Sequence, residues 1–328
     1  MTAVTVLGVP SSAGAYGVGL ERAPDALREA GLLDALRRRG IEVRDAGDLP
    51  VRQFRPDPAH RKQQNLESVV EVVQDVERRV RDIRTDDSLL LVIGGDCTIT
   101  LGVVSALAAD QPDVALAYFD GDIDLSTPLT TRSGILDAMG IAHMLALEGT
   151  APQLSGIGCR TPLMPGKRIA LIGYEDDDLD DDWRTIIRTH ELALFPASKL
   201  REQPVATATD ALAALAESSS LIVHFDVDAV DSTDLPLALY PHFNAGSSRD
   251  QAAACLKVLC SSPKLAALVV TEVNPCRDPD GIYLRLLAAS LAEAIPEEQP
   301  ARQRSGPDDS RHAFRATGTA RRVACASD

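Results

Sequence analysis

Short apolar runs that alternate with longer amphipathic segments constrain the fold of this chain most strongly. The apolar runs are four to six residues long and cover residues 4–9, 89–93, 114–119, 169–172, 221–225 and 265–270. Runs of this length suit strands that are buried on both faces of a parallel sheet. Apolar residues at helical spacing fill residues 23–39, 65–83, 100–109 and 282–294. The alternation predicts an α/β fold built from βαβ units.

One domain followed by a tail fits the length of the chain. The 328 residues are 45% hydrophobic, which is enough for a large core. Residues 1–295 are predicted to form the domain, with a polar surface loop at residues 52–64. Residues 296–328 are rich in Arg, Asp, Ser, Ala and Gly without any period, so we expect a disordered tail there.

Charge and cysteine usage exclude several classes of protein. The net charge of −15 argues against nucleic acid and anionic membranes as partners. The six cysteines form no C-x-x-C pair, so reduced thiols in a cytoplasmic protein are the simplest interpretation. The N-terminus lacks a basic region, which favours a first strand over a signal peptide. No apolar stretch of about 18 residues is present to span a membrane.

Carboxylates follow four of the predicted strands at the point where each strand ends. They are Asp96 in GGDC, Asp120, Asp122 and Asp124 in DGDID, Asp226 and Asp228 in DVD, and Glu272 in TEVNP. Ligands of an open parallel sheet bind beyond the carboxyl ends of its strands, so we expect one shared crevice. Carboxylates this close would repel one another, and a hard divalent cation such as Mn or Mg would relieve the repulsion. Solvated turns or helix caps are the alternative interpretation.

Five motifs, in order, resemble the signatures of the arginase/agmatinase (ureohydrolase) family. The segment SSAGAYGVGLERAPDALREAGLLDAL resembles the opening of arginases, and GGDCTIT resembles the GGDH-S/T turn. FDGDIDLSTPLTTRSG resembles DAHxDxNTPxTTxSG, HFDVDAVD resembles SFDVDxxDP, and TEVNP matches EVNP. The resemblance covers nearly all of residues 4–295. It implies a three-layer α/β/α arginase-like fold with a central, mostly parallel sheet.

The resemblance also implies a binuclear Mn site. The metal positions of the family fall on Cys97, Asp120, Asp122, Asp124, Asp226 and Asp228. The four aspartate ligands of the family are retained, but its two histidine ligands are replaced by Cys97 and Asp122.

The same resemblance implies residues that act on the substrate. The catalytic histidine of the family falls on Asp137, which joins Asp124 and Glu272 as a candidate catalytic residue; Glu272 would also bind the guanidinium. The residues that hold an α-amino acid head fall on Ser126, Ser133 and the acidic run at 175–178, with Asp176 and Asp178 as the candidate contacts.

The two replaced histidines change the expected charge of the site. Five aspartates and a thiolate carry about −6, against about −4 in the family pattern, so two divalent cations leave about −2. A more negative set of ligands makes bound water a weaker acid. Cys97 is a soft ligand, which shifts the preference from Mn toward Zn or Fe. Alternatively, Cys97 stays a protonated thiol and one of two metal positions is weak or empty.

Three positions bear on proton transfer and packing. Asp137 can shuttle a proton only if its pKa is raised. His143 could substitute for the lost catalytic histidine, but a structural, partly buried role is favoured. His224 is expected to point away from the carboxylates and to pack in the core.

Two functions from different classes remain open. The first is a metal-dependent hydrolase of a guanidino or amidine C–N bond, arginase- or agmatinase-like, that releases urea through a metal-bound hydroxide. Its substrate is a small cation, and the resemblance implies a homo-oligomer. The second is a degenerate member of the family with little hydrolase activity that binds a ligand or another protein. A narrower version of the first is a specialised amidinohydrolase with a one-metal or mixed site.

Overall fold

The computed structural model describes residues 2–298. Within these residues, eight strands form one sheet in the order β2-β1-β3-β8-β7-β4-β5-β6, and every neighbouring pair is parallel. The strands are β1 (Ala3–Gly8), β2 (Glu42–Asp48), β3 (Ser88–Ile93), β4 (Ala115–Phe119), β5 (Ile169–Ile172), β6 (Ala193–Phe195), β7 (Leu221–Asp226) and β8 (Leu265–Thr271). The predicted α/β fold with a parallel central sheet is confirmed.

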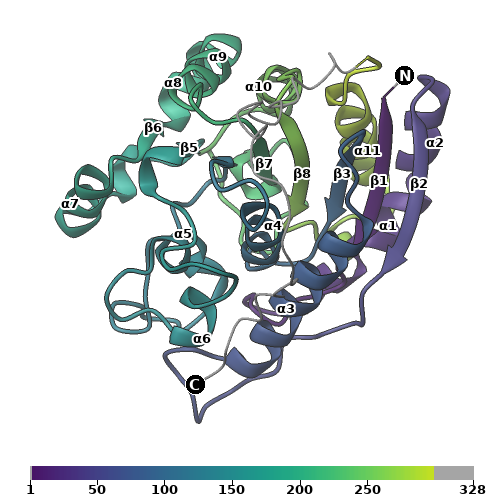
Figure 1. The fold of residues 1–328 in the computed structure, drawn as a ribbon. Coiled ribbons are helices and arrows are strands. Elements are labelled where there is room, and N and C mark those ends of the chain that lie inside the picture. Colours follow the sequence, from purple (N-terminus) through teal and green to yellow (C-terminus); the bar gives the residue numbers. More distant parts are fainter. Residues whose placement is uncertain (1, 299–328) are drawn as a thin grey trace, which may run out of the picture.

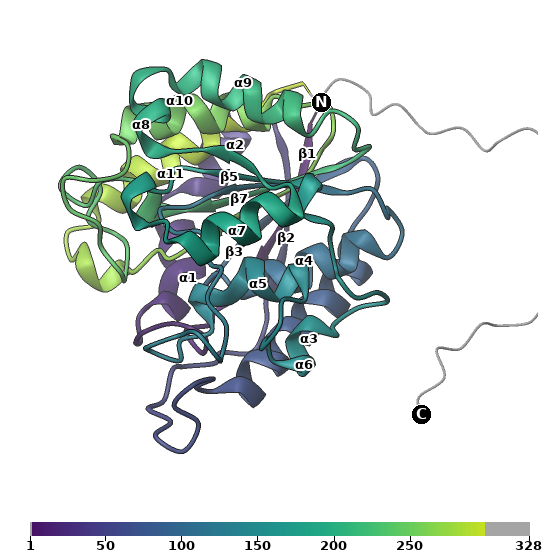
Figure 2. The same cartoon turned by 90° about the vertical axis from the view of Figure 1, so that its left-hand side faces the viewer.

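Helices cover both faces of the sheet and complete three layers (Figures 1 and 2). One face packs against α1 (Ala23–Glu29), α2 (Leu32–Arg38), α8 (Ala197–Glu202), α9 (Pro204–Ala214), α10 (Arg249–Cys260) and α11 (Ile282–Ala294). The other packs against α3 (Leu66–Ile83), α4 (Ile99–Ala108), α5 (Gly140–Leu145), α6 (Pro152–Ser155) and α7 (Asp181–His190). Strand residues alternate between the two cores: Leu91 and Ile93 contact the first and Val92 the second. Burial on both faces explains why these strands are continuously apolar.

The structure departs from the sequence-based elements in two places. Residues 23–39 form two helices rather than one, because Gly31 adopts a φ of 88° between α1 and α2, a conformation that favours glycine. Strands β2 and β6 were not predicted. They lie at the two edges of the sheet, and β2 in particular is largely exposed, so it has no apolar run to reveal it. The predicted loop at residues 52–64 contains no helix or strand of its own.

The packed domain extends slightly past residue 295, where the sequence predicts that it ends. Ile295 is fully buried, and its carbonyl accepts a hydrogen bond from Arg39 at 2.9 Å. The carbonyl of Glu297 accepts from the Thr2 amide at 3.2 Å. Residues 299–328, which hold most of the predicted tail, lie outside the described residues. Within residues 2–298, no helix combines the length and apolarity needed to cross a bilayer.

Strand order brings the acidic strand ends together. Strands β3, β8, β7 and β4 are consecutive in the sheet although they are far apart in the sequence. These are the four strands that run into the acidic motifs, and all point the same way. Their carboxyl ends therefore deliver the motifs to one edge of the sheet, where α/β folds bind ligands.

Candidate functional site

A pocket of about 330 Å³ opens at this edge of the sheet. The predicted metal and catalytic residues all line it, namely Cys97, Asp120, Asp122, Asp124, Asp137, Asp226, Asp228 and Glu272. Ser126 and Ser133 line it as well. Asp176 is not among the lining residues, and the side chain of Asp178 lies outside what the structure describes. Next to them, Glu175 forms an ion pair with Arg201 at 2.6 Å and accepts from the Gly246 amide.

Cys97 lies at the centre of a first group of donors. Its thiol donates to Oδ2 of Asp226 at 2.6 Å and lies 3.9 Å from Oδ2 of Asp120. Cys97, Asp120, His224 and Asp226 each offer one donor atom, and these atoms all lie within 4.8 Å of one another. All four side chains are buried. This separation is short enough for the four atoms to share one cation.

A second, more exposed group includes two residues that line the pocket, Asp122 and Asp228. It consists of Asp122, Asp228 and His242, whose donor atoms also lie within 4.8 Å of one another. The two groups are joined through the backbone: the Asp122 amide donates to Asp120 and the Asp228 amide to Asp226, each at 2.8 Å. His242 was missed at the sequence level, because it lies in a loop without any period between β7 and α10.

Glu272 and Asp137 form a third group with Cys97, again with donor atoms within 4.8 Å. The backbone amide of Cys97 donates to a carboxylate oxygen of Asp137. The Oε1 atom of Glu272 is buried and has no hydrogen-bond partner among the described residues. A buried carboxylate oxygen without a partner is costly, which indicates that it awaits a ligand.

The backbone is strained at two of these carboxylates. Asp124 has a φ of 48° and Glu272 a φ of 61°, in the left-handed region that residues other than glycine rarely adopt. Strain of this kind clusters at functional sites, where surrounding contacts hold it in place. Here the Glu272 amide donates to the Gly95 carbonyl at 2.9 Å, and Asp124 accepts a hydrogen bond from the Tyr118 hydroxyl.

Burial and mutual repulsion raise the pKa values of the carboxylates in the pocket. Burial, followed by the charge of Asp122, raises the pKa of Asp120 to about 7. Burial, followed by the charge of Asp96, raises the pKa of Asp137 to about 8. Burial also raises the pKa of Asp226 well above its usual range, with Asp228 as the next cause. The pocket therefore has a strong affinity for positive charge.

The surroundings also shift the pKa values of two histidines, His242 and His224. The pKa of His242 is raised to about 9, chiefly by its interaction with Asp122, whereas its partial burial acts in the opposite direction. Burial lowers the pKa of the enclosed His224 to about 3, so its imidazole is neutral.

The expectation that His224 points away from the carboxylates is wrong. Its Nε2 atom lies 3.4 Å from Oδ2 of Asp120. Residues two apart on a strand share a face, so alternation places His224 on the same face as Asp226. His143, in contrast, is structural, as expected. Its Nδ1 donates to the Met139 carbonyl at 2.7 Å and its Nε2 accepts from the Ala151 amide at 3.2 Å.

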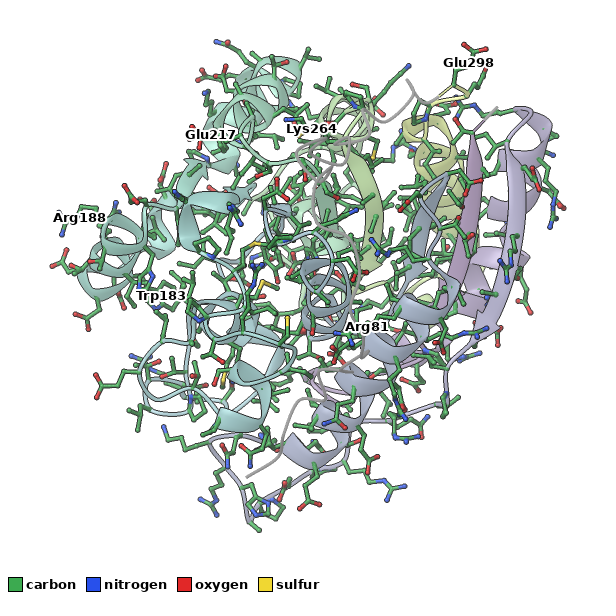
Figure 3. The ribbon with its side chains drawn as sticks, in the orientation of Figure 1. Arg81, Trp183, Arg188, Glu217, Lys264 and Glu298 are labelled. Carbon is green, nitrogen blue, oxygen red and sulfur yellow. The ribbon has the colours of Figure 1, made fainter. Side chains whose placement is uncertain are left out.

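Aromatic side chains, which the sequence reasoning did not single out, form the outer wall of the pocket. Tyr16 and Tyr240 have ring centroids 6.3 Å apart and are 62% and 55% exposed. Trp183, labelled in Figure 3, comes from α7 and lines the same pocket. Among the described lining residues there is no Lys or Arg. The pocket therefore combines an acidic floor with an aromatic mouth.

The donor set fits divalent metal ions. Carboxylate oxygens predominate, with imidazole nitrogens and one thiol available, a mixture suited to Mn, Zn or Fe. A cation would also relieve the repulsion that raises the carboxylate pKa values.

The chain is similar to known proteins in both sequence and fold. The model of the "Arginase family" matches residues 2–295. Human arginase-1 is 28% identical over 276 residues, which cover 83% of this chain and 85% of that protein. The structure of arginase from Bacillus caldovelox superposes with a TM-score of 0.82 at 23% identity, covering 91% of this chain and 99% of that one. Formimidoylglutamase from Bacillus subtilis superposes with a TM-score of 0.71 at 18% identity, covering 92% and 88%.

Proposed function

Since this chain belongs to the arginase family, we propose that it hydrolyses a C–N bond of a small cationic guanidino or amidine substrate, releasing urea from a guanidino compound or the corresponding amide from an amidine. Membership of the family supports metal-dependent hydrolysis as the class of reaction. Neither the pocket nor the relatives favour the alternative of a degenerate protein that only binds ligands or partners. A cytoplasmic location and a homo-oligomeric state stay predictions from the sequence.

The observation that carries the proposal is the position of Glu272 beside the carboxylate groups. Its side chain is 3% exposed, its Oε1 is unpartnered, and it lies in the same pocket as Asp120 and Asp226. A guanidinium or amidinium offers planar N–H donors and a positive charge, which are what a buried carboxylate requires. Bound to Glu272, such a group would hold its central carbon next to the candidate metal groups.

We propose that Cys97, Asp120, Asp122, Asp124, Asp226 and Asp228 hold the metal, with Mn as the first candidate and Zn or Fe as the alternatives that Cys97 favours. Bound metal would supply Lewis acidity that lowers the pKa of a water molecule. The buried position of Asp226 and Asp228 would keep bulk water from screening that effect.

Asp137 is the candidate for proton delivery to the leaving amine. It occupies the position of the family's catalytic histidine, lines the pocket and lies in one group of donors with Glu272. Its amide donates to the Gly14 carbonyl at 3.0 Å, which fixes the start of the short helical turn that carries it. A protonated carboxyl group at this position would donate toward the nitrogen that Glu272 positions.

The pocket favours a substrate tail without a carboxylate. Its floor is acidic, its described lining includes no Lys or Arg, and its mouth is formed by Tyr16, Tyr240 and Trp183. A guanidino compound with an amine or apolar tail matches these surfaces. The tail of N-formimidoylglutamate carries carboxylates and does not match.

The test is urea release by the full chain with added Mn²⁺. Arginine, agmatine and shorter guanidino acids would be compared, and formamide release from N-formimidoylglutamate would be measured in parallel. We expect urea from at least one guanidino compound and its loss in Glu272→Gln. Absence of hydrolysis of every amidine in the presence of Mn²⁺, Zn²⁺ or Fe²⁺ would refute the proposal.

A further inference from the structure

The first and second donor groups each contain an imidazole that the five motifs do not assign as a ligand: His224 stands at the Ser position of SFDVDxxDP, and His242 lies outside the motifs. We propose that His224 and His242 are metal ligands, one in each group, and that they take over from the histidines missing at positions 97 and 122. The inference rests on the proposed function only in requiring that the pocket binds divalent metal.

His242 presents a nitrogen to the second group. Its Nε2 lies 3.5 Å from Oδ2 of Asp122 and 3.8 Å from Oδ2 of Asp228. The atom is buried and is paired with these two carboxylates without a well-aligned hydrogen bond to either. Ligand atoms about 2.0–2.2 Å from a shared cation lie roughly 3.0–4.3 Å apart. Both separations fall within that range, so a cation between the three atoms would need little rearrangement.

The loop around His242 holds the imidazole in place. The Ser232 amide donates to the His242 carbonyl at 2.8 Å, and the Asn244 amide donates to Asp231 at 3.2 Å. The imidazole also packs against Tyr240 in a T-shaped arrangement, with ring centroids 5.5 Å apart and planes at 78°. A ligand positioned by contacts of this kind loses little freedom when it binds metal.

His224 presents a nitrogen to the first group. Its Nε2 lies 3.4 Å from Oδ2 of Asp120, and its Nδ1 lies 2.8 Å from the Thr100 hydroxyl. If Nδ1–H donates to Thr100, the lone pair of Nε2 faces the carboxylates, the thiol of Cys97 and the Thr271 hydroxyl, which lies 3.4 Å away. Metal-binding histidines characteristically use their second nitrogen in this way, which fixes the tautomer and the ring orientation.

Glu272 gives independent evidence that the pocket is built for a ligand. Its unpartnered Oε1 is buried in the same pocket and shares the third group with Cys97. Cys97 thus shares one group of donors with His224 and another with Glu272. With an imidazole in each of the first two groups, both candidate metal positions have a nitrogen ligand beside the carboxylate oxygens. A cluster of carboxylates held together only by hydrogen bonds would not require such a nitrogen.

The first experiment measures metal binding by the full chain with Mn²⁺ as the probe. Stoichiometry and Kd are compared for the unaltered chain, His242→Gln, His224→Asn and the control His143→Gln. We expect each of the first two variants to lose one ion, or to bind it at least tenfold more weakly, and the control to bind as the unaltered chain does. Unchanged Kd and stoichiometry in both His242→Gln and His224→Asn would overturn the proposal.

A second measurement covers the case in which His224→Asn does not fold. X-ray absorption of the unaltered chain loaded with Zn²⁺ reports imidazole ligands directly. We expect about one imidazole per zinc; spectra with only oxygen and sulfur ligands would overturn the assignment. If the variants lose metal but the unaltered chain hydrolyses no guanidino compound, the ligand assignment stands and the proposed function fails. If the unaltered chain binds neither Mn²⁺ nor Zn²⁺, both fail.

Discussion

The ring of Tyr118 stacks on the ring of His224, with centroids 4.1 Å apart and planes inclined by 7°. The two residues are paired across β4 and β7, and both side chains are fully buried. The hydroxyl group of the same tyrosine donates a hydrogen bond to the carboxylate of Asp124. Tyr118 therefore connects an imidazole of the first donor group to a strained carboxylate of the same pocket.

Replacing Tyr118 with Phe should separate these two contacts. The stack on His224 would remain, whereas Asp124 would lose a buried hydrogen-bond donor. Leaving one buried partner unsatisfied costs about 1–3 kcal/mol, so we expect the free energy of unfolding to fall by about that amount. Urea unfolding of the metal-free protein measures it. Tyr16→Phe, at an exposed ring, should have almost no effect; equal loss in both variants would contradict the role of the Asp124 contact.

Replacing Glu272 with Gln should weaken the binding of guanidinium ligands and leave metal content intact. Gln keeps the size and one acceptor but removes the charge. A hydrogen bond to a charged group contributes about 1.5–3 kcal/mol, which corresponds to about a 10- to 150-fold increase in Kd. Calorimetric titration with agmatine and arginine measures the change, and elemental analysis checks the metal. Equal affinity in the two proteins would exclude Glu272 as the cation-binding residue.

Asp137 should limit the rate of arginine hydrolysis. By the sequence resemblance, Asp137 stands where the family has its catalytic histidine, and general acid catalysis typically contributes about 10²–10⁴-fold. We expect the unaltered chain to turn over arginine well below about 10 s⁻¹, a typical enzyme rate, and Asp137→His to raise kcat. Urea release at neutral pH with added Mn²⁺ measures both. An unaltered chain that already reaches the typical rate would show that Asp137 and the altered ligands are fully competent.

The central strands and their acidic ends could be predicted because burial on both faces leaves a continuous apolar run. The edge strand β2 could not, since its residues are largely exposed and carry no such run. His242 could not be found either, because its position beside Asp228 depends on how the long loop between β7 and α10 folds. The orientation of His224 could have been predicted, because it is two residues from Asp226 on one strand and side chains two residues apart share a face.

His143 should make stability depend on pH. Burial lowers its pKa in the folded chain from 6.5 to about 4. Below about pH 6.5 the unfolded chain takes up a proton that the folded chain does not, so stability falls as the pH drops toward 4, by up to about 3 kcal/mol. His143→Gln removes this contribution. We expect a shallower fall in the free energy of unfolding between pH 7 and pH 4.5 than in the unaltered chain; identical slopes would contradict the prediction.

The aromatic mouth should select the tail of the substrate. Tyr240 and Trp183 line the pocket, whereas Phe243, which is 59% exposed, is three residues from Tyr240 but does not line it. An ammonium group over an aromatic face gains about 0.5–2 kcal/mol, so Tyr240→Ala and Trp183→Ala should each raise KM for an amine-tailed guanidine about 2- to 30-fold. Their kcat should change little, because neither ring belongs to the acidic floor. Phe243→Ala is the matched control and should leave KM unchanged. A rise in KM with Phe243→Ala as large as with Tyr240→Ala would show that the loop, rather than the ring that lines the pocket, determines the effect.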